Sequence, residues 1–288
     1  MALREQQSAV DYSPQTTEYV KSVLIEIRQI LGAFEGKYVI VGGAVPGLLI
    51  NNQEMPHVGT IDIDIGLHAS ALLTDSEYSS LIESLLDAGY TNSPPLRPFQ
   101  LARNFPPSGS MPEMSIIIDF LIPRNIHLYK NKPPLVKNFA AQRADGVDLA
   151  IKFNVSVDID GRMPSGAKNN AKIAVATIPA LLAMKGFALN NRSKPKDAYD
   201  IYYSVRNFPG GIEVLVKQTK DLLAFESARE GYGYINEKFL SIDHLGPRYV
   251  RSFLEDDDRT VNWSPDQLQR DAFGQVDAWL KGIGLRSS

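Results

Sequence analysis

The sequence contains no cysteine, only four histidines and no long hydrophobic run. Without cysteine there is no disulfide framework, thiolate zinc site, iron–sulfur cluster or cysteine nucleophile. No two histidines are four residues apart, as a helical zinc pair requires, and no Gly-x-Ser-x-Gly motif supports a histidine-based triad. Any metal chemistry must therefore use carboxylates, which favour hard ions such as Mg²⁺ or Mn²⁺.

The overall composition is that of a globular α/β protein. The 30 basic and 33 acidic residues give a net charge of −3, and 44% of the 288 residues are hydrophobic. The longest nearly apolar stretch, 38–50, is too short to span a bilayer, and the N-terminus has no hydrophobic leader. We therefore expect a cytoplasmic protein with no membrane partner.

Hydrophobic periodicity predicts a mixture of strands and helices. Apolar residues at three- and four-residue steps predict helices at 16–35, 75–88, 179–189, 197–206 and 265–283, with a short helix at 44–50. Short apolar runs predict strands at 38–41, 60–65, 114–122, 147–159 and 171–177, and prolines predict a loop at 94–112. We expect an α/β core over 1–178 and a helical C-terminal domain over 179–288.

Asp62 and Asp64 alternate with isoleucines on a predicted strand, so their carboxylates project from the same face. Two carboxylates this close repel unless a cation lies between them. An isolated Asp-x-Asp pair is more often a solvated strand face. Here Ile61, Ile63 and Ile65 indicate a buried strand, in which unpaired carboxylates would be costly.

Two further features can complete a site around this pair. Asp119 interrupts the apolar run 114–122, and three carboxylates would converge if that strand lies beside the Asp-x-Asp strand; alternatively, Asp119 reaches water at a strand end. Gly42 and Gly43 follow the strand 38–41, where they form either a simple tight turn or a backbone cradle for phosphates.

A third cluster lies between residues 181 and 205. Lys185 occupies a mostly apolar helix, from which it either extends to solvent or reaches a triphosphate. Asp197 and Asp200 are three apart on the next helix and face the same way. Acids near a helix N-terminus commonly interact with the helix dipole, which is the simpler interpretation of Asp197.

Together these motifs resemble the nucleotidyltransferase superfamily of the DNA polymerase β type. The segments that carry the resemblance are IVGGAV, TIDIDIGL, IIIDFLI and KGFALNNRSKPKDAYDIYYSV, which span about residues 38–206. The last is similar to the signature of the AbiEii-like branch, which includes toxins of type IV toxin–antitoxin systems. The 18 residues between Gly43 and Asp62 exceed the compact family pattern, and a second pair, Asp158 and Asp160, is interpreted as a hairpin end.

The resemblance implies an α/β (α+β) nucleotidyltransferase fold, with a short mixed sheet flanked by helices and a helical C-terminal part. It implies that Asp62, Asp64 and Asp119 hold Mg²⁺ or Mn²⁺, with Asp119 also acting as a base or orienting the nucleophile. Gly42 and Gly43 would contact the phosphates. The reaction would be attack of an acceptor hydroxyl on the α-phosphorus of an NTP, with ATP binding among the expected properties.

By the same resemblance, Lys185 would stabilise the triphosphate, and Asp197 or Asp200 would make a further polar contact near the nucleotide. The acceptor is an RNA such as tRNA or a protein, and a toxin role implies a cognate antitoxin. The alternatives are a small-molecule (aminoglycoside-type) nucleotidyltransferase, a non-catalytic nucleotide-binding relative and a sugar-nucleotide glycosyltransferase. Two basic stretches, either solvated surface or nucleic-acid contacts, contain Lys130, Lys132, Lys137 and Arg143, and Arg192, Lys194 and Lys196.

Overall fold

The computed structural model describes residues 7–68, 75–106, 113–126, 136 and 138–287, which divide into two compact units. The sheet unit comprises Pro14–Ala44 and Gly59–Ala176. The helical unit comprises Val45–Val58 and the chain from Thr177 onward, together with the N-terminal segment that ends at Ser13. The chain therefore passes from the sheet unit to the helical unit twice. Val45–Val58, between the first and second strands, returns to the sheet unit, whereas the chain from Thr177 onward remains in the helical unit.

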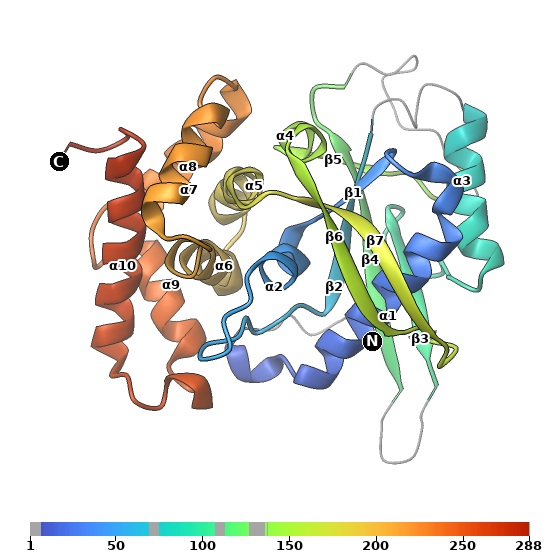
Figure 1. Ribbon diagram of the computed structural model, residues 1–288, viewed down its shortest axis with the longest axis horizontal. Helices are drawn as coiled ribbons and strands as arrows, with labels where there is room; N and C mark the ends of the chain where they lie inside the picture. The colour runs from blue at the N-terminus through green and yellow to red at the C-terminus, as the bar shows by residue number, and fades with distance from the viewer. Residues whose placement is uncertain (1–6, 69–74, 107–112, 127–135, 137, 288) are drawn as a thin grey trace. The chain divides into compact units, whose positions relative to one another are not determined.

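Within the described residues, seven strands form one mixed sheet (Figure 1). Their order is β3-β4-β2-β1-β7-β6, and β5 also pairs with β4. β2 is antiparallel to β1 and parallel to β4, so a strand flanks it on either side. In chain order the strands are β1 (Tyr38–Val41), β2 (Asp62–Leu67), β3 (Gln100–Phe105), β4 (Met114–Pro123), β5 (Gln142–Ala144), β6 (Asn154–Arg162) and β7 (Lys168–Ala176). The mixed sheet that the resemblance implied is confirmed.

Helices α1 (Pro14–Ile30) and α4 (Val147–Lys152) pack against strands of this sheet, and α3 (Asp75–Asp87) packs against α1. Val20, Val23 and Ile27 of α1 are at most 4% exposed, at the three- and four-residue spacing that predicted the helix. α1 contacts β2, β4, β6 and β7. The apolar stripe of the helix therefore forms part of the core of the sheet unit.

The prediction of a strand over 147–159 was wrong in its first half. Residues Val147–Lys152 form α4, which follows Gly146 in the left-handed conformation (φ 77°). β6 begins only at Asn154. A short apolar run does not by itself distinguish a buried helix from a strand. Here the run forms a helix that follows the turn at Gly146 and packs on the sheet.

The predicted loop at 94–112 contains β3, and its residues 107–112 lie outside the described part of the chain. β3 pairs antiparallel with β4, from Gln100 opposite Asp119 to Phe105 opposite Met114. Proline cannot donate to a strand ladder, so the prolines remain outside these six residues. The strand was not predicted because prolines flank it in the sequence, and its pairing with β4 identifies it.

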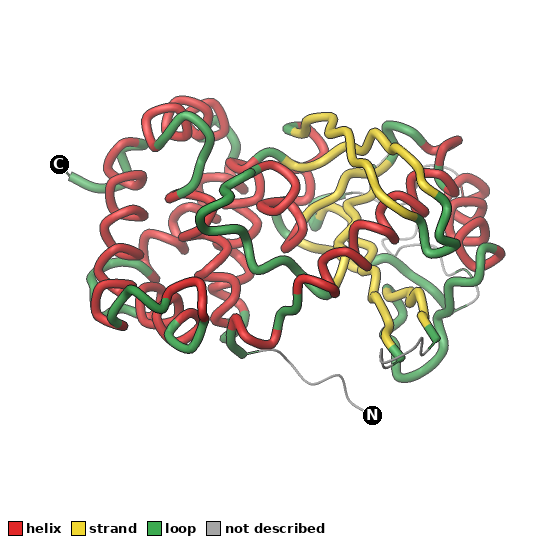
Figure 2. The backbone as a smooth tube through the Cα atoms, turned by 60° about the horizontal axis from the view of Figure 1, so that its bottom comes forward, coloured by secondary structure: helices red, strands yellow, loops and turns green. Residues whose placement is uncertain are grey.

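The described helices of the second unit are α2 (Val45–Leu49), α5 (Ile178–Asn191), α6 (Pro195–Arg206), α7 (Ile212–Leu222), α8 (Glu226–Lys238), α9 (Leu245–Leu254) and α10 (Pro265–Gly282). Figure 2, with helices in red and strands in yellow, shows this unit as helices and loops. At the start of α10, the Ser264 side chain accepts a hydrogen bond from the Gln267 N–H at 3.2 Å and so caps the helix. Over the described ranges, no helix is long and apolar enough to cross a membrane.

Two glycines let the backbones of α5 and α8 touch. A Cβ added to Gly186 would lie 1.9 Å from the carbonyl oxygen of Gly231, and one added to Gly231 would lie 2.3 Å from that of Ala183. Neither glycine has a positive φ, so the requirement is for space and not for an unusual conformation. No larger side chain fits unless the two helices separate.

We predict that Gly186→Ala lowers the free energy of unfolding by about 1–3 kcal/mol, because the added methyl group overpacks the α5–α8 contact. Gly233→Ala in α8 is the matched control, since its Cβ would have no atom within 4 Å. That change should be neutral or stabilise by up to about 1 kcal/mol, as expected for glycine-to-alanine in a helix. Urea denaturation measures both values, and equal effects would contradict the close-contact explanation.

Candidate functional site

Three carboxylates lie on one region of the sheet unit. The parallel pairing of β2 with β4 places Asp64 directly opposite Asp119. Side chains alternate along a strand, so Asp62 shares the face of Asp64, whereas Ile63 and Ile65 are fully buried on the other face. The condition set by the sequence, that the strand of Asp119 lies beside the Asp-x-Asp strand, is therefore confirmed.

Neutral side chains donate hydrogen bonds to two of these carboxylates. Thr60 Oγ1 donates to Asp62 Oδ1 at 2.5 Å, and Gln100 Nε2 donates to Asp119 Oδ1 at 2.8 Å. Asp62, Asp64 and Asp119 are all only partly buried. Sequence analysis missed both donors, and in the case of Gln100 the reason is that β3 was taken for a loop.

The Gly-Gly turn lies against the same acids. Gly42 and Gly43 begin a 3₁₀ turn (η3, Gly42–Ala44) directly after β1, whose last residue, Val41, pairs with Asp64. Gly42 has a φ of 69°, and a Cβ there would lie 1.8 Å from Asp64 Oδ2. The backbone passes directly beside the Asp64 carboxylate. Residue 42 must therefore be a glycine, which adopts a positive φ readily and has no Cβ to meet the carboxylate.

The donor set fits a hard divalent ion. Carboxylate oxygens are the ligands that Mg²⁺ and Mn²⁺ prefer, and the absence of a side chain at Gly42 makes room for the Asp64 carboxylate. Among the described residues, no three acidic or imidazole side chains are already gathered as a metal site. Like charges repel without a cation between them, so Asp62, Asp64 and Asp119 are the residues that would hold such an ion.

The other predicted site residues form a buried ion cluster in the helical unit. Lys185 Nζ lies 2.8 Å from Asp197 Oδ1 and 2.7 Å from Asp200 Oδ2. Arg192 also binds Asp197, and Lys196 Nζ lies 2.7 Å from Asp200 Oδ1. Asp197 and Asp200 thus face one way, as predicted. Lys185 does not extend to solvent, because its ammonium group is buried between the two carboxylates.

His57 is a member of this cluster that sequence analysis did not identify. Its Nε2 lies 2.9 Å from Asp200 Oδ1, and its ring stacks on Tyr199 with centroids 5.3 Å apart. Tyr199 Oη also accepts a hydrogen bond from the Val58 N–H at 3.1 Å. These contacts join positions more than 140 residues apart, and no local pattern around His57 signals them.

Burial and charge pairing act against each other in the cluster. Burial opposes ionisation of Asp200, but Lys185 and Lys196 hold the pKa of its carboxyl well below the ordinary value. Burial also disfavours the Lys185 ammonium, yet Asp197 and Asp200 raise the pKa of Lys185 above its usual range. For His57, burial prevails over the hydrogen bond with Asp200 and lowers the pKa to about 4. Lys185, Asp197 and Asp200 are therefore charged at neutral pH, and His57 is neutral.

The comparisons with known proteins identify the family. A family model described as "Nucleotidyl transferase AbiEii toxin, Type IV TA system" matches residues 59–273, about three quarters of the chain, which include Asp62, Asp64, Asp119 and Lys185. The chain belongs to the AbiEii family. It is therefore a nucleotidyltransferase toxin of a toxin–antitoxin system, which implies an antitoxin partner.

Other comparisons add little to this assignment. Among solved structures, the crystal structure of JHP933 from Helicobacter pylori has 10% sequence identity and a TM-score of 0.39, and the match covers 96% of each chain. No curated protein matches the sequence. Gly42 and Gly43 precede the region that the AbiEii model matches.

The second Asp-x-Asp pair of this AbiEii-family chain lies away from the acids of β2 and β4. Asp158 and Asp160 lie on β6, which forms an antiparallel hairpin with β7 as predicted. Asp158 faces Lys172 across the hairpin at 3.9 Å, and Asp160 accepts a hydrogen bond from Asn170 at 2.7 Å. Cross-strand partners within the hairpin account for both side chains.

Four residues of the predicted basic stretches lie in the described part of the AbiEii-family chain. Arg143 donates to the backbone carbonyl of Ile126, and Lys196 is buried in the ion cluster. Arg192 is half-exposed while bound to Asp197, and Lys194 is partly buried. The remaining candidates, Lys130, Lys132 and Lys137, lie outside the described residues.

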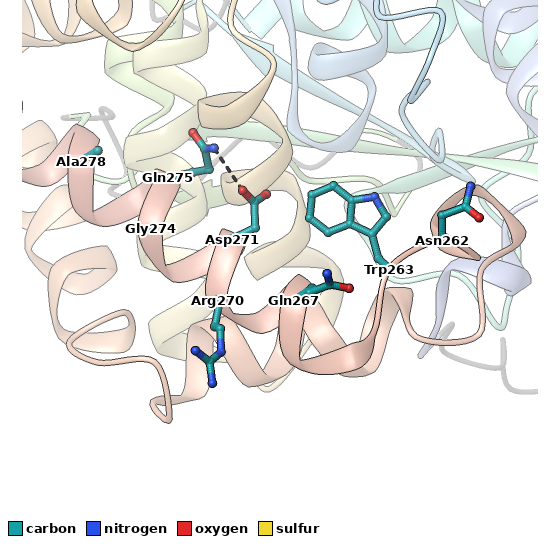
Figure 3. A pocket seen from close by; sticks show the side chains of 8 residues that line it. All are labelled: Asn262, Trp263, Gln267, Arg270, Asp271, Gly274, Gln275 and Ala278. Carbon is teal, nitrogen blue, oxygen red and sulfur yellow. Dashed lines mark hydrogen bonds between the residues drawn. The ribbon is translucent and has the colours of Figure 1, made fainter.

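A cavity of about 580 Å³ lies along α10 in the helical unit of the AbiEii-family chain (Figure 3). Its lining residues are Asn262, Trp263, Gln267, Arg270, Asp271, Gly274, Gln275 and Ala278. Gln275 donates to Asp271 at 3.2 Å, and the Arg206 guanidinium lies 4.9 Å from the Trp263 ring centroid. The lining contains none of the predicted site residues.

We predict that lowering the pH from 6.5 to 4 destabilises the protein through His57. The folded protein keeps His57 neutral down to about pH 4, whereas its ordinary pKa is 6.5. Between these values the unfolded chain binds more protons, so stability falls as the pH falls, by at most about 3 kcal/mol for this group.

The variant His57→Gln should lose this part of the pH dependence of stability. His244→Asn, at the exposed start of α9, is the control. Unfolding free energies of each protein from pH 7 to pH 4 test the difference, and the same pH dependence in His57→Gln and the wild type would refute it.

Proposed function

We propose that the chain is a metal-dependent nucleotidyltransferase that moves a nucleoside monophosphate from an NTP to an acceptor hydroxyl. One observation carries the proposal: Asp64 lies opposite Asp119 on adjacent parallel strands, with Gly42 directly against the Asp64 carboxylate. Buried apolar side chains fix the other face of the same strands. This arrangement, in a member of a nucleotidyltransferase family, supports phosphoryl transfer at the acids of the sheet unit.

The three acids would share one task, and Asp119 would have a second. Asp62, Asp64 and Asp119 would hold the ion, and Asp119 would also accept the proton of the acceptor hydroxyl or orient that group. A bound Mg²⁺ or Mn²⁺ would neutralise charge on the triphosphate and on the departing pyrophosphate. The hydroxyl oxygen would form a bond to the α-phosphorus as the bond to pyrophosphate breaks. The backbone at Gly42 and Gly43 would approach the phosphates, since no side chain at 42 intervenes.

The roles of Lys185, Asp197 and Asp200 stay predictions. Lys185 was assigned to the triphosphate, and the two acids to polar contacts near the nucleotide. The cluster contains three cations, including Arg192 and Lys196, against two carboxylates, with His57 neutral. Its excess of positive charge supports attraction of a phosphate, although a phosphate contact by Lys185 requires exchange of at least one carboxylate partner.

The acceptor we propose is an RNA such as tRNA, or a protein hydroxyl, in keeping with a toxin role. A small molecule of the aminoglycoside type is the alternative acceptor. Neither is distinguished by the acids of β2 and β4, because they act on the nucleotide and on whichever hydroxyl is presented. The acceptor therefore has to be identified by experiment, from the molecule that receives the nucleoside monophosphate of a labelled NTP.

We predict that Asp64→Ala and Asp119→Ala each reduce nucleotide transfer by at least about 100-fold, because each removes an ion-holding carboxylate. The measurement is incubation with each α-labelled NTP and Mg²⁺, with cell RNA, cell protein or aminoglycosides as acceptors. Asp160→Ala is the matched control: it removes an acid from the other Asp-x-Asp pair and should leave transfer unchanged.

Other outcomes point to other functions. NTP binding without turnover, unaffected by Asp119→Ala, would replace the proposal with a non-catalytic nucleotide-binding role. Release of sugar products from a nucleotide sugar would indicate a glycosyltransferase. Full activity in the presence of excess EDTA would contradict the dependence on a metal.

A further inference from the structure

We infer that Gln100 is a positioning residue that orients the Asp119 carboxylate for ion binding. The inference rests on the proposed function, because Asp119 is an ion ligand only under that proposal. Gln100 acts through Asp119 and is assigned no contact with the nucleotide or the acceptor. It lies on β3, the strand that the proline-rich sequence concealed.

The Gln100 amide is held at both ends. Its Oε1 accepts a hydrogen bond from the Arg97 N–H at 3.0 Å, and its Nε2 donates to Asp119 Oδ1 at 2.8 Å. The backbone N–H of Gln100 also donates to the Arg97 carbonyl at 2.9 Å, which closes a tight turn before β3. A flipped amide would place a donor against the Arg97 N–H and an acceptor against a carboxylate. The amide therefore has one satisfactory orientation, with its NH₂ group toward Asp119.

This arrangement fixes where a carboxylate oxygen of Asp119 lies. Gln100 and Asp119 are directly opposite in the β3–β4 register, and Asp119 and Asp64 are directly opposite in the β2–β4 register. The amide thus braces Asp119 from the side of β4 remote from Asp64. Partners that orient ligand side chains typically change metal affinity by 10- to 100-fold when removed.

The competing explanation is that Gln100 only strengthens the pairing of β3 with β4. A second side-chain hydrogen bond between the same strands separates the two explanations. Ser115 Oγ donates to Asn104 Oδ1 at 2.7 Å, on an exposed part of the strand pair. Ser115→Ala removes that bond and leaves Asp119 and Gln100 in place.

The experiment measures Mn²⁺ affinity in the full chain without nucleotide, by electron paramagnetic resonance of the free ion. We expect Gln100→Leu to weaken Mn²⁺ binding about tenfold or more, and Ser115→Ala to leave it unchanged. Gln100→Met, with an unbranched side chain that lacks a donor, should reproduce the loss if the leucine variant folds poorly. In nucleotide transfer, Gln100→Leu should need more Mn²⁺ for half-maximal rate but approach the wild-type kcat at saturating Mn²⁺.

Unchanged Mn²⁺ affinity in well-folded Gln100→Leu or Gln100→Met would overturn the inference. An equal loss in Ser115→Ala would also overturn it, because strand pairing would then be the cause. No Mn²⁺ binding by the wild-type protein would remove its basis. If the wild type binds Mn²⁺, Gln100→Leu binds it more weakly and neither transfers nucleotide, the proposed function fails while the role of Gln100 stands.

Discussion

The parallel pairing of β2 with β4 is the constraint on which the site depends. These strands are separated by about 50 residues of sequence, yet their register sets Asp64 opposite Asp119. Ile63 and Ile118, neighbours in the same register, are fully buried. A slip of one residue in either strand would move carboxylates into the core and isoleucines to the open face, which is too costly to occur. The burial of isoleucines thus fixes the position of the acids.

Acids in the two units are stabilised in different ways. In the sheet unit, Asp62 accepts a hydrogen bond from Thr60 and Asp119 accepts one from Gln100, and both donors are neutral groups. In the helical unit, Asp200 is fully buried between lysine ammonium groups, which compensate the cost of removing its charge from water. Ion pairing thus balances the buried charges of the helical cluster.

Elements with strong local patterns were predicted well, and those without them were not. The alternation of Asp62 and Asp64 with isoleucines predicted a strand and the face its acids share, and the structure confirms both. The stretch Val147–Lys152 was misassigned because a short buried helix and a buried strand have similar apolar runs. Gln100 was missed since its role arises from strand pairing across β3 and β4.

By itself, the sequence determined the chemistry available: carboxylates without thiolates, the faces on which they lie and the family to which the chain belongs. Tertiary structure decided which of these groups meet. It placed Asp119 beside Asp64, Gln100 beside Asp119, and His57 and Lys185 around Asp200. The physical reason is range. Periodicity reports which face of one element is apolar, whereas contacts such as that of His57 with Asp200, 143 residues away, arise only when separate elements pack together.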